Sequence, residues 1–401
     1  MKRILIIIAT LSSYSLFAQT TVAQYTDFLN QEHLSPKAYI LQLFEQNDII
    51  ILGERDHRDT TQYDLILDII GDNWFIENVA HVYTEVGVTN NTEWANQVLK
   101  ANYKTDNDFE TAVIKLYREL DFNSLWEKYN MYKYLKGIYT INKGLAPNKK
   151  ITVGLTDQAF SWQNMTKEKL EKFHKILSST YRYRDSIMAA NFINLYEKQM
   201  PINGTKKALL IQSRPHAINM DVTYKGRKIK NTGSYIVDKY ENKTKIIAFN
   251  WYHWMPLEWY KWMPEKSIKL TDDGKWNAAF ELTSHNPVGF DLKNTPFGLT
   301  EFDYSYEQGI KYQDVIDGII YYKPFYEFVC TVGVPNVVDD AFAVELIRRG
   351  KLVNGEDFSD SETLLMDYYN DVRSFECEDY KMLKEQMNKW LKQKKGKHFS
   401  N

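Results

Sequence analysis

The sequence predicts an α/β fold with a mostly parallel central sheet flanked by helices and carrying helical insertions. Three observations support this prediction. Short apolar runs, typical of strands buried on both faces, recur along the chain. Between them lie longer segments whose apolar residues recur at helical spacing, as in βα units with parallel strands. A polar residue comes directly after several of the short runs, at the carboxyl end of the predicted strand, where α/β proteins bind ligands.

The predicted core covers about residues 47–325. Its strands are Ile49–Leu52, Val79–Val86, Ile151–Leu155, Ala208–Ile211, Lys245–Phe249 and Asp314–Tyr322. Helical patterns cover residues 24–46, the segment around Leu65–Ile70, Thr92–Gly137 and Thr166–Lys198. Pro36 suits the first turn of the second part of the first helical segment. A helical C-terminal extension is expected over residues 336–401.

The N-terminus has the pattern of a cleavable secretory signal over residues 1–18. Lys2 and Arg3 precede the apolar run Ile4–Phe17, which is too short to span a membrane. No cysteine lies near the expected cleavage point, which argues against a lipoprotein anchor. We therefore expect a secreted or periplasmic protein with one α/β domain over residues 19–401 and no membrane span.

Composition excludes some classes of partner and leaves others open. The formal net charge of −2 becomes −4 without Lys2 and Arg3, so no basic excess indicates nucleic acid. Cys330 and Cys377 are the only cysteines, too few for a thiolate zinc site. They could form one disulfide in an oxidising compartment, but their spacing does not establish it.

Ionisable side chains recur at the predicted strand ends. They are Glu54 and His57, Glu85, Asp157, and Arg214 with His216. Two carboxylates and two imidazoles suit activation of water by a general base, with the second imidazole as acid or oxyanion donor. The same residue types could bind a divalent metal, with Glu85 and His216 as ligands. No G-x-S-x-G motif or cysteine occurs in these turns, which favours water or histidine over an acyl-serine route.

Further residues near these turns are candidates for substrate binding. They are Arg58, Asp157, Arg214, Asn250, Trp251 and Trp254. The aromatic stretch Trp251–Pro264 could stack on a ring-bearing or sugar-like small molecule. Alternatively, its rings pack a long excursion of the chain onto the sheet.

Six short motifs occur in an order that resembles the erythromycin esterase family. They are GERDH at Gly53–His57, TEVG at Thr84–Gly87, GLTDQ at Gly154–Gln158, RDSIMAANF at Arg184–Phe192, RPHA at Arg214–Ala217 and NTGSYIVDKY at Asn231–Tyr240. Together they cover roughly Ile49–Tyr322. The wider superfamily includes haem-binding ChaN-like proteins.

The resemblance implies a hydrolase-like site built on the first, second and fourth turns. His57 would be the general base, Glu54 and Glu85 would orient it or hold a metal, and His216 would be its partner. Arg184 would lock a helix beneath the site. Arg58 and the turn Ser213–His216 depart from the glycine and the His-Asn-x-His pattern of the esterases. The resemblance therefore extends to the general site more than to a macrolide substrate.

These observations predict a secreted hydrolase that cleaves an ester or related bond in a small molecule. A protein of the ChaN type that binds haem or metal without turnover is the alternative. A third reading, a protein that kept the fold and lost the site, is disfavoured by the intact Glu54, His57, Glu85 and His216. No cofactor is required by the residues alone.

Overall fold

The computed structural model describes residues 20–123, 129–178, 183–224, 227–254, 268–283, 286–303, 309–355 and 361–397. The predicted signal segment and most of the stretch Trp251–Pro264 lie outside these ranges. Within them, no helix is long and apolar enough to cross a membrane.

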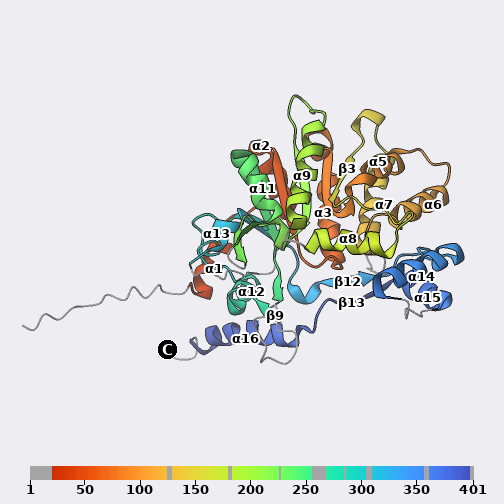
Figure 1. Ribbon diagram of the computed structural model, residues 1–401. Helices are drawn as coiled ribbons and strands as arrows, with labels where there is room; N and C mark the ends of the chain where they lie inside the picture. Colours follow the sequence, from red (N-terminus) through yellow and green to blue (C-terminus); the bar gives the residue numbers. More distant parts are fainter. Residues whose placement is uncertain are drawn as a thin grey trace, which may run out of the picture.

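Among the described residues, a seven-stranded sheet forms the centre of the molecule, in the order β10-β11-β7-β1-β4-β2-β3 (Figure 1). The strands are β1 (Ile49–Glu54), β2 (His81–Val88), β3 (Thr152–Asp157), β4 (Ala208–Ser213), β7 (Thr244–Phe249), β10 (Val288–Asp291) and β11 (Gly318–Tyr321). Neighbouring strands run parallel except β10, which is antiparallel to β11. The mostly parallel α/β fold is confirmed.

Helices cover both faces of this sheet. One face carries α2 (Pro36–Gln46), α3 (Thr60–Ile70), α4 (Asn73–Asn78), α5 (Thr92–Lys100), α6 (Asp106–Tyr117) and α7 (Tyr129–Lys143). The other carries α1 (Val22–Leu29), α9 (Tyr183–Lys198), α10 (Arg214–Ala217), α11 (Thr232–Lys239), α12 (Lys275–Leu282) and α13 (Tyr312–Val315). Helix α8 (Lys167–Ser178) precedes α9.

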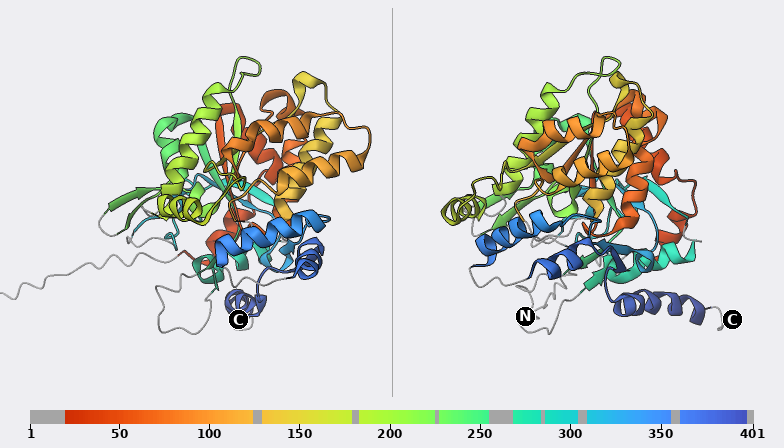
Figure 2. Two further views of the ribbon diagram at one scale, coloured as in Figure 1. Left: turned by 45° about the vertical axis from the view of Figure 1, so that its right-hand side comes forward. Right: turned by 90° about the vertical axis from the view of Figure 1, so that its right-hand side faces the viewer.

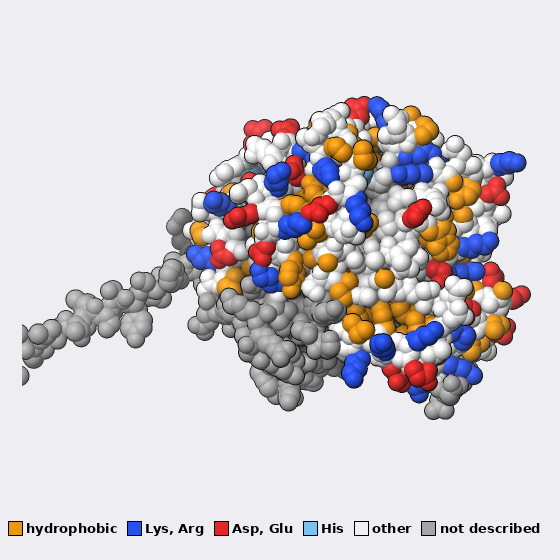
Figure 3. Space-filling view, turned by 45° about the horizontal axis from the view of Figure 1, so that its top comes forward, with side chains coloured by type: hydrophobic (Ala, Val, Ile, Leu, Met, Phe, Trp, Pro, Cys, Tyr) orange, Lys and Arg blue, Asp and Glu red, His pale blue; other side chains and the backbone are white. Residues whose placement is uncertain are grey.

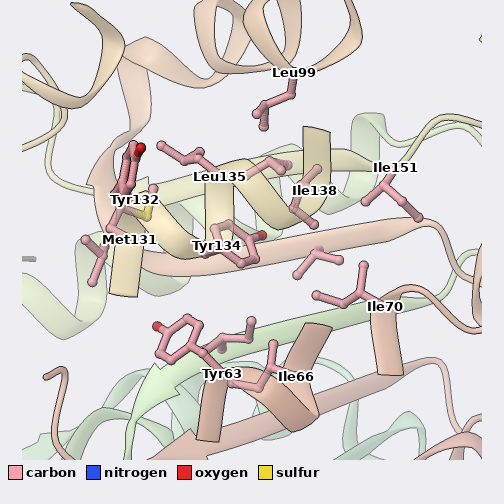
Figure 4. Packing of buried hydrophobic residues seen from close by; sticks show 14 of the residues in the cluster. Tyr63, Ile66, Ile70, Leu99, Met131, Tyr132, Tyr134, Leu135, Ile138 and Ile151 are labelled. Atoms are coloured by element: carbon pink, nitrogen blue, oxygen red, sulfur yellow. The ribbon is translucent and has the colours of Figure 1, made fainter. Parts of the chain in front are cut away.

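The first strand shows how the three layers are joined. Ile50 and Leu52 belong to the core on one face and Ile49 and Ile51 to the core on the other, as the alternation of side chains in a strand requires. All four side chains are fully buried. In Figure 4, buried side chains of α3 and α7 face each other beside the sheet. This packing holds the carboxyl end of β1 in place.

Two predicted strands differ from the observed ones by more than the position of their ends. The segment Asp314–Tyr322 contains a turn of helix, α13, before the short strand β11. Strand β2 runs two residues further than predicted, and its register with β3 shifts between Thr84 and Val88. Gly87 has φ +129° there, and a Cβ at this position would lie 2.7 Å from Leu155. This irregularity changes the local direction of the strand at the position of Glu85.

The C-terminal part forms a smaller layer along one side of the sheet. It contains α14 (Asp340–Asn354), α15 (Glu362–Asn370) and α16 (Tyr380–Lys397), drawn in blue in Figures 1 and 2. It also contains a strand, β13 (Arg373–Glu376), antiparallel to β12 (Val329–Val332). Two further antiparallel pairs are β5 (Asp221–Tyr224) with β6 (Arg227–Lys230) and β8 (Tyr252–Trp254) with β9 (Ile268–Leu270).

A disulfide between Cys330 and Cys377 closes this layer, with the two Cα atoms 4.9 Å apart and a sequence separation of 47. We expect the Cys330→Ala/Cys377→Ala variant to lose up to about 4 kcal/mol of unfolding free energy, because the open chain gains conformational entropy when it unfolds. Urea unfolding measures the loss. An unchanged unfolding midpoint would contradict it, and reduced wild-type protein is the matched comparison.

On the face seen in Figure 3, acidic and basic side chains are interspersed. This agrees with a net charge of only −2.

Candidate functional site at the carboxyl edge of the sheet

Strands β1, β4, β2 and β3 are neighbours in the sheet, and all four run in the same direction. Their carboxyl ends therefore carry their polar residues to one edge. Of the predicted site residues, the edge brings together Glu54, His57, Glu85, Asp157 and His216, with Arg184 from α9. The predicted gathering of these turns is confirmed in space.

The turn after β1 is fixed by side chains on both sides of His57. Asp59 caps α3 by accepting the N–H of Thr61 at 2.9 Å. The amide of Asn130, on α7, donates to the backbone carbonyls of His57 at 2.8 Å and Asp59 at 2.9 Å. Because these hydrogen bonds hold the backbone of the turn against helix α7, the imidazole of His57 has a defined position.

A buried arginine next to this turn was not predicted from the sequence. The Nε atom of Arg55 lies 2.6 Å from Asp59 Oδ2, and its guanidinium carbon lies 3.7 Å from the ring centre of Phe328. Phe328 directly precedes β12, so this cation–π contact ties the turn to the disulfide-linked layer. The sequence shows Arg55 only as one charge in a run of six.

His57 lies between two carboxylates. Its Nδ1 atom forms a short ion pair with Glu54 Oε1, and its Nε2 atom is 3.8 Å from Glu85 Oε1. The hydroxyl of Tyr63, on α3, donates to Glu54 Oε2 at 2.8 Å. Burial disfavours the imidazolium, but the charges of Glu54 and Glu85 outweigh burial and raise the pKa of His57 to about 9.

Glu85 is the centre of the cluster. Its Oε2 atom accepts the backbone N–H and the hydroxyl of Ser213, both at 2.8 Å. Its Oε1 atom lies 3.3 Å from Arg184 Nη2 and 3.6 Å from His216 Nε2. Burial opposes ionisation, but the positive charges at His216, Arg184 and His57 hold the pKa of Glu85 well below its usual range. Glu85 is therefore a carboxylate with cationic groups around one oxygen.

Arg184 connects the second and third turns. Its Nε and Nη2 atoms donate to the two carboxylate oxygens of Asp157 at 2.9 and 2.7 Å, and Nη2 also faces Glu85. Burial lowers the pKa of Arg184, but the charges of Asp157 and Glu85 outweigh burial and raise it. Arg184 therefore lies within the cluster and joins α9 to the ends of β2 and β3. Both carboxylate oxygens of Asp157 therefore accept hydrogen bonds from Arg184.

A cavity of about 210 Å³ adjoins the cluster. It is lined by Glu54, Arg55, Asp56, Arg214, Pro215, Trp251 and Tyr252. The guanidinium carbon of Arg214 lies 4.2 Å from the ring centre of Trp251, and the Trp251 side chain is buried. Trp251 is therefore a buried wall of this cavity.

Of three other predicted substrate contacts, two are engaged in contacts within the chain, and the side chain of the third is not described. Arg58 pairs with Asp56, its Nη2 atom 2.7 Å from Asp56 Oδ2. The amide of Asn250 donates to the Lys323 carbonyl and accepts the N–H of Tyr322, so it joins β7 to β11. Trp254 ends β8, but its side chain lies outside the described residues.

The donor set does not fit a divalent metal. A metal at Glu85 and His216 would have to take the place of Arg184, whose Nη1 is 3.4 Å from His216 Nε2. In the described residues, no group of three or more His, Cys, Asp and Glu side chains is arranged to hold a metal ion. A guanidinium already supplies the positive charge that a metal would bring.

The sequence model of the erythromycin esterase family matches residues 61–323, more than half of the chain. The chain belongs to the erythromycin esterase family. The match contains Glu85, Arg184 and His216, whereas Glu54 and His57 precede it. No curated protein matches the chain in sequence.

Solved structures similar to this family member are distant in sequence. A succinoglycan biosynthesis protein is 11% identical, with 75% of this chain and 96% of that one covered and a TM-score of 0.49. A mutant of the erythromycin esterase EreC in its open conformation is 11% identical, with 71% of this chain and 92% of that one covered and a TM-score of 0.38. The haem-binding ChaN of Campylobacter jejuni is 15% identical, with 56% of this chain and 89% of that one covered and a TM-score of 0.27.

The raised pKa of His57 predicts how stability depends on pH. The pKa of His57 is about 9 in the folded state and near 6.5 in the unfolded state. Its contribution to the free energy of unfolding is therefore complete below about pH 6.5 and is lost as the pH rises through about 9. It amounts to at most about 3 kcal/mol. Urea unfolding across this window measures it, with His57→Gln as the reference. An equal pH dependence in both proteins would contradict the prediction.

Proposed function

We propose that this protein hydrolyses an ester or related bond of a small molecule, with His57 as general base. One observation supports this most directly. The Nε2 atoms of His57 and His216 lie 3.8 and 3.6 Å from the same oxygen of Glu85, at the strand edge beside a cavity. Two imidazoles that converge on one point are suited to removing one proton and supplying another.

In the proposed reaction, Nε2 of neutral His57 takes a proton from water as the water oxygen attacks the carbonyl carbon. Glu54, at Nδ1, stabilises the resulting imidazolium. The bond from the carbonyl carbon to the leaving oxygen then breaks, and Nε2–H of the His216 imidazolium protonates that oxygen. The products are an acid and an alcohol. Arg184 and Glu85 keep the two rings apart and oriented.

The cavity beside Glu54 would hold the substrate, with Arg214 and Trp251 as its binding side chains. The indole and guanidinium faces favour a ring-bearing substrate that has a polar group. With the signal-like segment at residues 1–18, we propose that the protein acts outside the cytoplasm.

A binding function for haem has less support from the geometry. An axial histidine needs a ring nitrogen directed at the iron, but both Nε2 atoms lie within 4 Å of Glu85 Oε1. Haem would have to displace that carboxylate from its bonds with Ser213.

Acid release from p-nitrophenyl acetate, p-nitrophenyl butyrate and erythromycin tests the proposal. The mature protein is purified without chelators or a metal column, and its metal and haem content is measured in the same preparation. We expect hydrolysis of at least one ester, and loss of it in Glu85→Gln. Stoichiometric haem without hydrolysis of any ester would overturn the proposal in favour of binding.

We further expect dialysis against a chelator to leave the rate of ester hydrolysis unchanged, because Arg184 already neutralises Glu85. The rate before and after dialysis, with a zinc hydrolase treated in parallel, checks this. Loss of activity that returns on adding a divalent ion would contradict it.

A further inference from the structure

The second nitrogen of His216 has a partner that the sequence did not identify. Nδ1 of His216 lies 2.8 Å from Oδ1 of Asp185, a residue of α9 that is completely buried. The same oxygen accepts the backbone N–H of Thr232 at 2.9 Å, with the Thr232 hydroxyl 3.1 Å away. Thr232 begins α11, so the carboxylate is fixed between two helices and the ring.

This pair repeats the arrangement around His57. In both, a buried carboxylate contacts Nδ1, and Nε2 faces Oε1 of Glu85. The carboxylates come from different elements, Glu54 from the end of β1 and Asp185 from α9. Consecutive residues of α9 thus act on two parts of the site, since Arg184 contacts Asp157 and Glu85 while Asp185 contacts His216.

We propose that Asp185 is a positioning residue that keeps a proton on Nδ1 of His216 and directs Nε2 at the reaction centre. An ionised carboxylate only accepts hydrogen bonds, so Nδ1 must be the donor. In the neutral ring Nε2 is then without a proton, and in the imidazolium both nitrogens carry one. Without Asp185, the nearest carboxylate to the ring is Glu85 at Nε2, and the proton of the neutral ring moves to that side.

The catalytic part of this inference rests on the proposed hydrolase function, whereas the proton position does not. It is therefore tested first by NMR on the full mature chain labelled with ¹⁵N-histidine. A long-range ¹H–¹⁵N spectrum reports which ring nitrogen carries the proton, and His216→Gln identifies the signals. We expect Nδ1 to carry the proton of the neutral His216 ring in the wild type, and Nε2 to carry it in Asp185→Ala.

Thr232→Val is the matched control. It removes the threonine hydroxyl from Asp185 but keeps the backbone N–H, so it alters the helix junction without touching His216. We expect its histidine spectrum to equal that of the wild type. A neutral wild-type His216 ring without a proton on Nδ1 would overturn the proposal, even if Asp185→Ala did not fold.

Hydrolysis of p-nitrophenyl acetate gives the second readout. We expect Asp185→Ala to lower kcat by about 10- to 100-fold with little change in KM, and Thr232→Val to leave both unchanged. A fall in kcat together with a rise in KM in Thr232→Val would indicate a merely structural junction and would overturn the assignment. If wild-type protein hydrolyses no ester, the proposed function fails while the NMR result still decides the role of Asp185.

Discussion

His57→Gln is expected to lower kcat for ester hydrolysis by about 10²- to 10⁴-fold, the usual contribution of a general base. Glutamine keeps a polar group near Glu54 but cannot take a proton from water. The loss should appear in kcat, because the cavity beside Glu54 keeps its own binding side chains Arg214 and Trp251. Initial rates with p-nitrophenyl acetate over a range of concentrations measure it.

His81→Gln is the matched control for this variant. His81 starts β2, at the opposite end from Glu85, and its Nδ1 contacts Thr152 Oγ1 rather than a site residue. We expect its kcat to equal that of the wild type. Thermal melts establish that both variants are folded. Full activity in His57→Gln would show that another group is the base.

The second large effect is expected in the pH dependence of kcat/KM. Only neutral His57 can act as a base, and its pKa of about 9 leaves roughly 1% of the ring neutral at pH 7. The rate should therefore rise by about 50-fold between pH 7 and pH 9 and then level off. Initial rates at constant ionic strength, corrected for spontaneous hydrolysis, measure this profile.

His57→Gln is again the control that separates enzyme-catalysed hydrolysis from spontaneous hydrolysis. Its residual rate should lack this rise with pH. Stability needs checking at each pH, since the ion pairs of His57 weaken over the same window. A wild-type profile that is flat from about pH 7 to pH 9 would contradict His57 as base.

Much of the fold could be predicted from local patterns. Ile49–Leu52 is apolar throughout and short, so a strand buried on both faces was the natural reading, and β1 contains it. Pro36 does occupy the first position of α2, after the cap Ser35. In contrast, Val288–Asp291 has only four residues and includes a glycine, and its strand is made by pairing with β11. Such an edge strand has no signal of its own.

The site was predicted in part for the same reason. Glu54 ends β1 and His57 comes three residues later, so a local pattern located them. Asp185 lies 31 positions from His216, and the two meet only because α9 packs on the sheet over β3 and against α11. Asp185 lies in the first turn of α9, and that position carries no mark of a role at a distant turn. The disulfide was likewise undecided until β12 and β13 were paired.

By itself, the sequence determined the α/β class, the strand ends that carry ionisable residues and the family that the chain resembles, because these depend on neighbours along the chain. Only the tertiary structure decided which carboxylate faces which imidazole. Arg184 turned out to bind Asp157 and Glu85, and Asp185 to bind His216, although the two are adjacent in sequence. Those distances depend on how α9 and the sheet pack together, and packing between distant segments leaves no local pattern.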